Sequence, residues 1–153
     1  MASRFNLIDF LHSLLAPFKA MNYSNLDFSE SFSVEERTAM IEYLKECGQC
    51  PADHYNLDFY WNNKMGESCD ACWDYRQEDN IFFSNDRHFD YRMDGFKKLV
   101  RDCVHEIEHR KQHRVLKLFY FIFTIPVVRN FTIEIFANKA GARAGRYFKL
   151  EDI

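Results

Sequence analysis

The segment His105-Glu106-Ile107-Glu108-His109 has residue types and a spacing that suit metal-assisted hydrolysis. Residues four apart on an α-helix lie one turn apart on the same face, so both imidazoles can reach one zinc ion. Glu106 lies beside them without being needed as a ligand, and a carboxylate there can take a proton from water. The alternative interpretation is an ordinary amphipathic helix whose solvated face carries these polar residues.

The cysteines form a second candidate site. Four of the five make two C-x-x-C pairs separated by eighteen residues: Cys47 with Cys50, and Cys69 with Cys72. Four thiolates would close a tetrahedral zinc site and leave no position for water, so this site would be structural. The alternative is four reduced cysteines buried as small hydrophobic side chains.

Two helices are needed to position the histidine segment. Asp94 is a suitable N-cap for a helix over 95–114, whose apolar residues share one face while both histidines lie on the opposite face. A last helix is expected to begin near Asn130 and to carry Glu134. Its small residues would let another backbone approach closely: Ala137, Ala140, Gly141 and Ala144. The apolar residues 115–125 are expected to form a helical piece between the two.

Shorter elements are expected in the first half of the chain. Ser33 and Glu36 form a capping box, which predicts a helix over 34–46. Alternation over 54–61 predicts a strand, and further strands are expected near 73–75 and 81–83. The two cysteine pairs would then flank a hairpin-like segment. An amphipathic helix over 5–20 is expected before these elements.

Composition limits the kind of protein. A length of 153 residues predicts one domain over 1–153, and 47% hydrophobic with 28% charged residues is typical of a folded chain. The net charge of −3 argues against a nucleic-acid partner. The longest apolar stretch, 118–128, is too short to span a membrane, and the N-terminal residues do not have the pattern of a signal peptide. We therefore expect a cytoplasmic protein without a membrane partner.

A second motif adds a resemblance to a known family. The histidine segment followed by Glu134-Ile135-Phe136-Ala137-Asn138 resembles the zincin metallopeptidases, and within them the gluzincin branch. It is similar to small repressor-cleaving metallopeptidases of the ImmA/IrrE kind, over roughly residues 80–144. The resemblance implies that His105, His109 and Glu134 are zinc ligands and that Glu106 is the catalytic base. The alternative for Glu134 is a surface residue in the first turn of a helix, favoured by the helix dipole.

The resulting expectation is an α+β, zincin-like domain that hydrolyses peptide bonds in a protein or peptide substrate. It would contain N-terminal helices, a short sheet with a zinc-knuckle hairpin at 47–72, the histidine helix and a C-terminal ligand helix. It would hold two zinc ions, one catalytic and one structural. The candidates for the group that stabilises the oxyanion are Tyr120, Arg143, Arg146 and His113.

Two other functions stay open. One is a zinc-stabilised interaction module that is not an enzyme, with the histidine segment as a polar helix face. The other is a protease that acts on nucleic-acid-bound protein in the manner of SprT-like proteins. Those place the cysteine module after the histidine motif, whereas here it precedes the motif.

Overall fold

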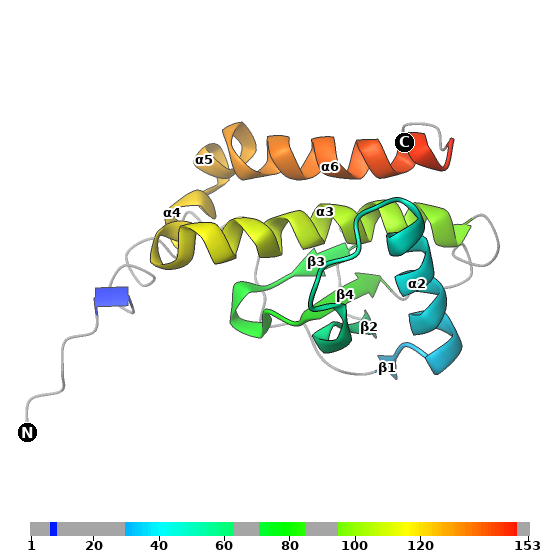
Figure 1. Ribbon diagram of the computed structural model, residues 1–153. Coiled ribbons are helices and arrows are strands. Elements are labelled where there is room, and N and C mark those ends of the chain that lie inside the picture. Colours follow the sequence, from blue (N-terminus) through cyan, green and yellow to red (C-terminus); the bar gives the residue numbers. More distant parts are fainter. Residues whose placement is uncertain (1–6, 9–29, 63–70, 85–94, 150–153) are drawn as a thin grey trace, which may run out of the picture.

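The computed structural model describes residues 7–8, 30–62, 71–84 and 95–149. Most of the helix expected over 5–20 lies outside these residues, as do Cys69 and Asp94. The described part is a mixed α+β structure with a four-stranded sheet. Helix α3 covers one face of the sheet, and α6 lies along the other side of α3 (Figure 1). Helix α3 is therefore the middle layer of three.

The sheet is mixed and has the strand order β1-β2-β4-β3. The strands are β1 (Glu30–Ser31), β2 (Asp58–Asn62), β3 (Ala71–Trp73) and β4 (Asn80–Ser84). Strands β2 and β4 pair in parallel, and β1 and β3 are antiparallel to their neighbours. Large side chains from the three longer strands point to the α3 side and form the core there: Phe59, Trp61, Trp73, Ile81 and Phe83.

The prediction of a hairpin between the cysteine pairs is wrong. Strand β2 pairs with β4 instead of β3, in the register Phe59 to Ile81, and β3 pairs with β4 at the edge of the sheet. The expected strand over 54–61 also begins later, because His54–Asn56 form a 3₁₀ turn. A second 3₁₀ turn, Tyr75–Gln77, connects β3 to β4 and allows those two to form the hairpin.

The expected first-half helix is confirmed as α2 (Val34–Glu46), including its capping box. The Ser33 hydroxyl accepts a hydrogen bond from the Glu36 amide, and the Glu36 carboxylate accepts one from the Ser33 amide. Met40, Ile41 and Leu44 bury the inner face of α2 against the core. The capping box gives a partner to two amides at the helix start, those of Ser33 and Glu36.

Helix α3 (Gly95–Leu116) is the longest element among the described residues. Its predicted apolar face is confirmed, since Leu99, Val100, Cys103 and Ile107 are at most 1% exposed in the core beneath the sheet. Lys117 then adopts a positive φ of 50°, which an α-helix cannot contain, and α3 ends there.

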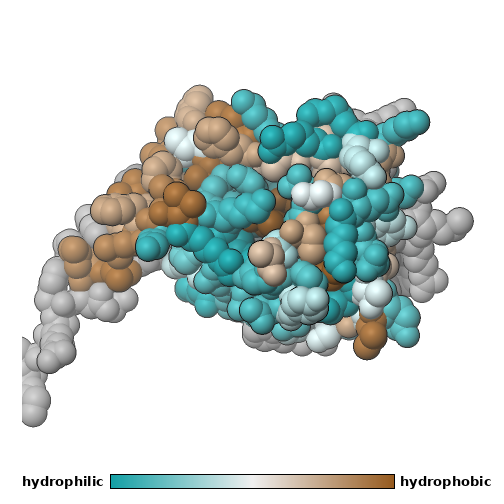
Figure 2. Space-filling model, in the orientation of Figure 1, coloured by the Kyte–Doolittle hydropathy of each residue, from teal (hydrophilic) through white to brown (hydrophobic). Residues whose placement is uncertain are grey.

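Three helices follow α3 in the described part of the chain. After a 3₁₀ turn (Lys117–Phe119) come α4 (Tyr120–Phe123), α5 (Pro126–Phe131) and α6 (Ile133–Tyr147). The last helix therefore begins three residues later than expected. Apolar side chains gather on the surface around α4 and α5 (Figure 2), among them Phe119, Val127 and Phe131. Within the described residues, no helix combines the length and hydropathy needed to cross a membrane.

Candidate metal centre

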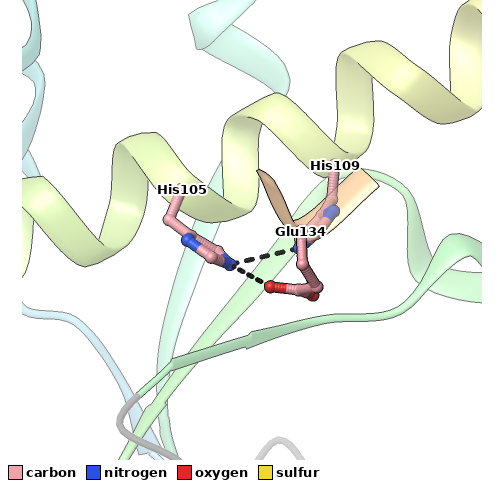
Figure 3. A group of neighbouring side chains, drawn as sticks. All are labelled: His105, His109 and Glu134. Carbon is pink, nitrogen blue, oxygen red and sulfur yellow. Dashed lines mark hydrogen bonds and ion pairs between the residues drawn. The ribbon is translucent and has the colours of Figure 1, made fainter. Parts of the chain in front are cut away.

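Two imidazoles and a carboxylate converge between α3 and α6. His105 and His109 project from the middle of α3, and Glu134 comes from the first turn of α6 (Figure 3). Nε2 of His105 lies 3.2 Å from Oε2 of Glu134, and Nε2 of His109 lies 3.0 Å from its Oε1. The two Nε2 atoms are 3.2 Å apart. Of the residues that the structure describes, only these three form a His, Cys, Asp or Glu group with ligand atoms all within 4.8 Å.

Close packing of α6 on α3 brings Glu134 to the histidines. The predicted small residues are at the contact, with Ala137, Ala140 and Ala144 buried against α3. A Cβ added at Gly141 would lie 3.3 Å from the Arg101 carbonyl oxygen and 3.6 Å from Cβ of His105. Larger side chains would therefore hold the two backbones apart.

Electrostatics keep the Glu134 carboxylate ionised. Burial alone would raise its pKa, but hydrogen bonds from His105 and His109 and the charge of Arg129 hold that pKa well below its usual range. Arg129, near the end of α5, donates from Nε to Oε1 of Glu134 at 2.8 Å. Burial lowers the pKa of His105, but its hydrogen bond to Glu134 and the negative charges of Glu106, Glu134 and Asp102 together outweigh this effect, so the pKa is raised overall. The cluster thus offers an anionic oxygen and two imidazole nitrogens.

Gln112, which the sequence analysis did not single out, contacts both the centre and α6. Its Oε1 lies 2.9 Å from Nδ1 of His109, and its Nε2 donates to the carbonyl oxygen of Ile133 at 3.0 Å. A polar residue three positions after a ligand histidine lies on the same helix face. That spacing was the available signal in the sequence.

Glu106 lies beside the centre and is only 8% exposed. It is not one of the three converging residues, as expected for a base that is not a ligand. Tyr120, at the start of α4, is 5% exposed and lies within electrostatic reach of both Glu106 and Glu134. Burial and the Glu106 charge raise the pKa of Tyr120 well above its usual range, so its hydroxyl is protonated at neutral pH. It can therefore act as a hydrogen-bond donor.

The other candidates for oxyanion stabilisation are placed differently. Arg143 and Arg146 are exposed on α6. The His113 ring lies among aromatic rings, 5.2 Å from the Tyr120 ring and 5.6 Å from the Trp73 ring. Tyr120 is the candidate whose pKa responds to the charges of both Glu106 and Glu134.

The structure does not gather the three described cysteines of the C-x-x-C pairs. Cys47 and Cys50 follow α2 and are partly buried, whereas Cys72 is buried in β3. These three do not form a group of ligand atoms within 4.8 Å of one another. With Cys69 outside the described residues, the four-cysteine zinc site stays a prediction.

The first pair also has a local structural reason. Cys47 caps α2, and Gly48 follows with a positive φ of 71°. The Gly48 amide donates to the Lys45 carbonyl, and the Gln49 amide donates to the Leu44 carbonyl. This is the Schellman pattern, which ends helices and favours glycine. The Gly48 position is thus explained without a metal.

Two arginines at the end of α3 have acidic partners within the protein. Arg110 is 2% exposed and forms ion pairs with Asp53 at 2.7 Å and Asp79 at 2.8 Å. Arg114 pairs with Asp53 and Glu78. These two cations therefore tie α3 to the loops around the sheet, which supports a structural role.

An apolar groove lies beside the centre. It has a volume of about 380 Å³ between the second half of α3 and the start of α6, and its apolar walls are Val115, Leu116, Phe123, Ile133 and Phe136. Gln112 also lines it, so one side chain contacts both the groove and His109.

Comparisons with protein-family models, curated proteins and solved structures find no significant match to this chain. The functional argument therefore rests on the chain's own geometry.

Proposed function

We propose that this protein is a zinc-dependent peptidase whose ion is held by His105, His109 and Glu134. The observation that carries the proposal is the convergence of these three side chains from two helices. Glu134 is 25 positions from His109 in the sequence, so helix periodicity alone does not bring them together. The proposed fold is correspondingly zincin-like, with the histidine helix and the Glu134 helix packed together.

The donor set fits catalytic zinc. Two imidazole nitrogens and one carboxylate oxygen are a common three-ligand set, which leaves the fourth position open. Tetrahedral ligands at ~2.0–2.1 Å from zinc lie about 3.3 Å from one another. The three contacts here, between 3.0 and 3.2 Å, are close to that spacing. Only small movements would be needed to admit the ion.

The remaining residues have roles that follow from their positions. A zinc ion at this site would polarise a peptide carbonyl and activate a water molecule. Glu106 would accept the proton of that water and deliver it to the leaving amine. Tyr120 would donate a hydrogen bond to the oxygen of the attacked carbonyl. The apolar groove would receive a hydrophobic side chain of the substrate.

The alternative of a zinc-stabilised interaction module draws less support from the arrangement. That function depends on the four-cysteine site, and its three described members do not converge. A polar helix face would also leave the histidines in solvent, whereas His109 is only 6% exposed under α6.

Replacement of Glu106 by Gln tests the peptidase mechanism. The variant should fold and bind zinc like wild type, because Glu106 is not a ligand. Hydrolysis of casein or a mixed peptide library should fall by ~100-fold or more, the scale for loss of a general base. Zinc content is measured by elemental analysis and hydrolysis by fluorescence of labelled products.

The matched control for this experiment is Glu108→Gln, which makes the same change two residues away. It should retain zinc, and any change in its hydrolysis should stay small beside the loss in the Glu106 variant, because Glu108 lines the groove and not the zinc cluster. Equal hydrolysis by wild type and the Glu106 variant would contradict the mechanism. Zinc binding without hydrolysis of any substrate tried would favour a non-enzymatic function.

A further inference from the structure

The hydrogen bonds of Gln112 fix the orientation of its side-chain amide. The Ile133 carbonyl oxygen can only accept a hydrogen bond, so the group facing it at 3.0 Å is the Gln112 NH₂. The opposite end of the amide, Oε1, then faces Nδ1 of His109 at 2.9 Å. A reversed amide would place its oxygen against the Ile133 carbonyl oxygen and lose that bond.

This orientation in turn sets the hydrogen on His109. An amide oxygen accepts and cannot donate, so Nδ1 of His109 must carry the hydrogen of that bond. In the zinc-bound state the ring is neutral and has one N–H, which is then on Nδ1. Any hydrogen that Nε2 shares with Glu134 in the metal-free protein is released, and the Nε2 lone pair faces the ion. Nε2 is the atom that faces Glu134 and His105, at 3.0 and 3.2 Å. The ring therefore presents its ligand atom to the place where the three donors meet.

Gln112 also connects the two helices that supply the ligands. Its partner Ile133 immediately precedes Glu134 and is 5% exposed, and both bonds of Gln112 are partly buried. A single side chain on α3 thus orients one ligand and anchors the helix start that carries another. Carboxylates, backbone carbonyls or water usually occupy such positions next to metal-bound histidines.

We infer that Gln112 is a positioning residue of the metal centre, which selects Nε2 of His109 as the ligand atom and fixes the start of α6. The inference rests on the proposed zinc site and concerns metal binding separately from hydrolysis. A neutral amide at this position adds no negative charge, so Glu134 remains the anionic donor of the three ligands.

The test compares Gln112→Leu with Gln112→Glu. Leu removes both bonds, and zinc affinity should fall by ~10–100-fold, as for other residues that orient a ligand. Glu keeps an acceptor for Nδ1–H but loses the donor to Ile133. It should stay within a few-fold of wild-type zinc affinity while its melting temperature falls. Affinity is measured by competition with a chromogenic chelator, and folding by circular dichroism.

A spectroscopic measurement tests the ligand atom directly. Long-range ¹H–¹⁵N spectra of the zinc-loaded protein should show hydrogen on Nδ1 of His109. In Gln112→Leu that hydrogen should exchange faster with solvent. The matched control is Lys111→Leu, an exposed neighbour on the same helix, which should leave zinc affinity unchanged.

Several results would overturn the inference. These are wild-type zinc affinity in a folded Gln112→Leu variant, an equal loss in Gln112→Glu, an equal loss in Lys111→Leu, or hydrogen on Nε2 of zinc-loaded His109. The metal centre itself would be wrong if wild-type protein bound no zinc, or if its zinc stayed bound in His109→Ala. The two failures are therefore distinguishable.

Discussion

Glu134 contacts both histidines and Arg129, and its carboxylate is the anionic donor of the proposed centre. In the absence of metal, hydrogens shared between the carboxylate and imidazoles would hold the cluster together at 3.0–3.2 Å. A bound ion would replace those hydrogens, so zinc uptake should release protons. The same arrangement explains why the cluster is compact without an ion.

Glu134→Ala should therefore abolish the zinc site. Removal of one of three protein ligands should lower zinc affinity by more than ~100-fold, beyond the effect of residues that only orient ligands. The fold should persist, because the core of the sheet and α3 is separate from this side chain. Zinc per chain by elemental analysis and the circular dichroism melting curve measure the two effects.

Glu108→Ala is the control for the ligand experiment. Glu108 lies on α3 between the histidines in sequence but lines the apolar groove and not the cluster. Its removal should leave zinc bound. Zinc loss in Glu108→Ala with retention in Glu134→Ala would require a different ligand set.

At the scale of elements, the packing of α6 on α3 decides the geometry of the centre. Small residues line this contact, and a Cβ added at Gly141 would lie 3.3 Å from the Arg101 carbonyl oxygen. Because Glu134 is two turns earlier on α6, any shift of that helix would move the carboxylate away from the imidazoles.

Gly141→Val should weaken both packing and zinc binding. Even a Cβ would lie 3.3 Å from the Arg101 carbonyl oxygen, and two further methyl groups cannot fit without displacement of α6. Overpacking of this kind costs about 1–3 kcal/mol of unfolding free energy. Urea unfolding and chelator competition measure the two losses.

Lys139→Val provides the matched control, since it places the same side chain on the exposed face of α6. It carries the helix-propensity cost of valine without a clash at α3. Zinc affinity should be unchanged in this variant. An unchanged affinity in Gly141→Val as well would show that α6 does not need its close approach.

At the scale of the whole molecule, an ionic network connects segments that are distant in sequence. Arg110 on α3 is almost fully buried and pairs with Asp53, which precedes β2, and with Asp79, which precedes β4. The Arg110 guanidinium also donates to the Glu78 carbonyl oxygen. The network thus fixes the loops at one end of the sheet to the helix that carries the histidines.

The free energy of unfolding of Asp53→Asn should depend less on pH in the acid range than that of wild type. Hydrogen bonds from Arg110, then Arg114, outweigh burial and hold the pKa of Asp53 well below its usual range. A carboxylate with a depressed folded-state pKa stabilises the fold above the unfolded pKa of ~3.9 and loses that contribution as pH falls further. At pH 7 the variant should lose about 1–3 kcal/mol of unfolding free energy.

Urea titrations at pH 7 and at pH values below 4 measure this effect. The difference between wild type and Asp53→Asn should shrink progressively below pH ~4, as the Asp53 contribution is lost. The exposed Asp58→Asn serves as the control and should show little difference at pH 7. A gap between wild type and Asp53→Asn that is constant across pH would contradict the assigned role of the ion pair.

The sequence by itself determined the features that depend on neighbouring residues. The capping box of α2, the buried face of α3 and the shared face of His105 and His109 are confirmed because hydrogen bonding and periodicity within one helix set them. The small residues of α6 likewise predicted a close helix contact. Only a resemblance between motifs linked Glu134 to the histidines before its position was known.

Tertiary structure alone decided the features that join distant segments. The parallel pairing of β2 with β4 replaced the expected hairpin, because strand partners depend on the core formed with α3 and not on order along the chain. The same packing brought Glu134 to the histidines and the Ile133 carbonyl to Gln112. Among the described residues, it did not bring Cys47, Cys50 and Cys72 into one cluster of ligand atoms. Local periodicity sets which face a residue occupies, but only packing between elements sets what that face meets.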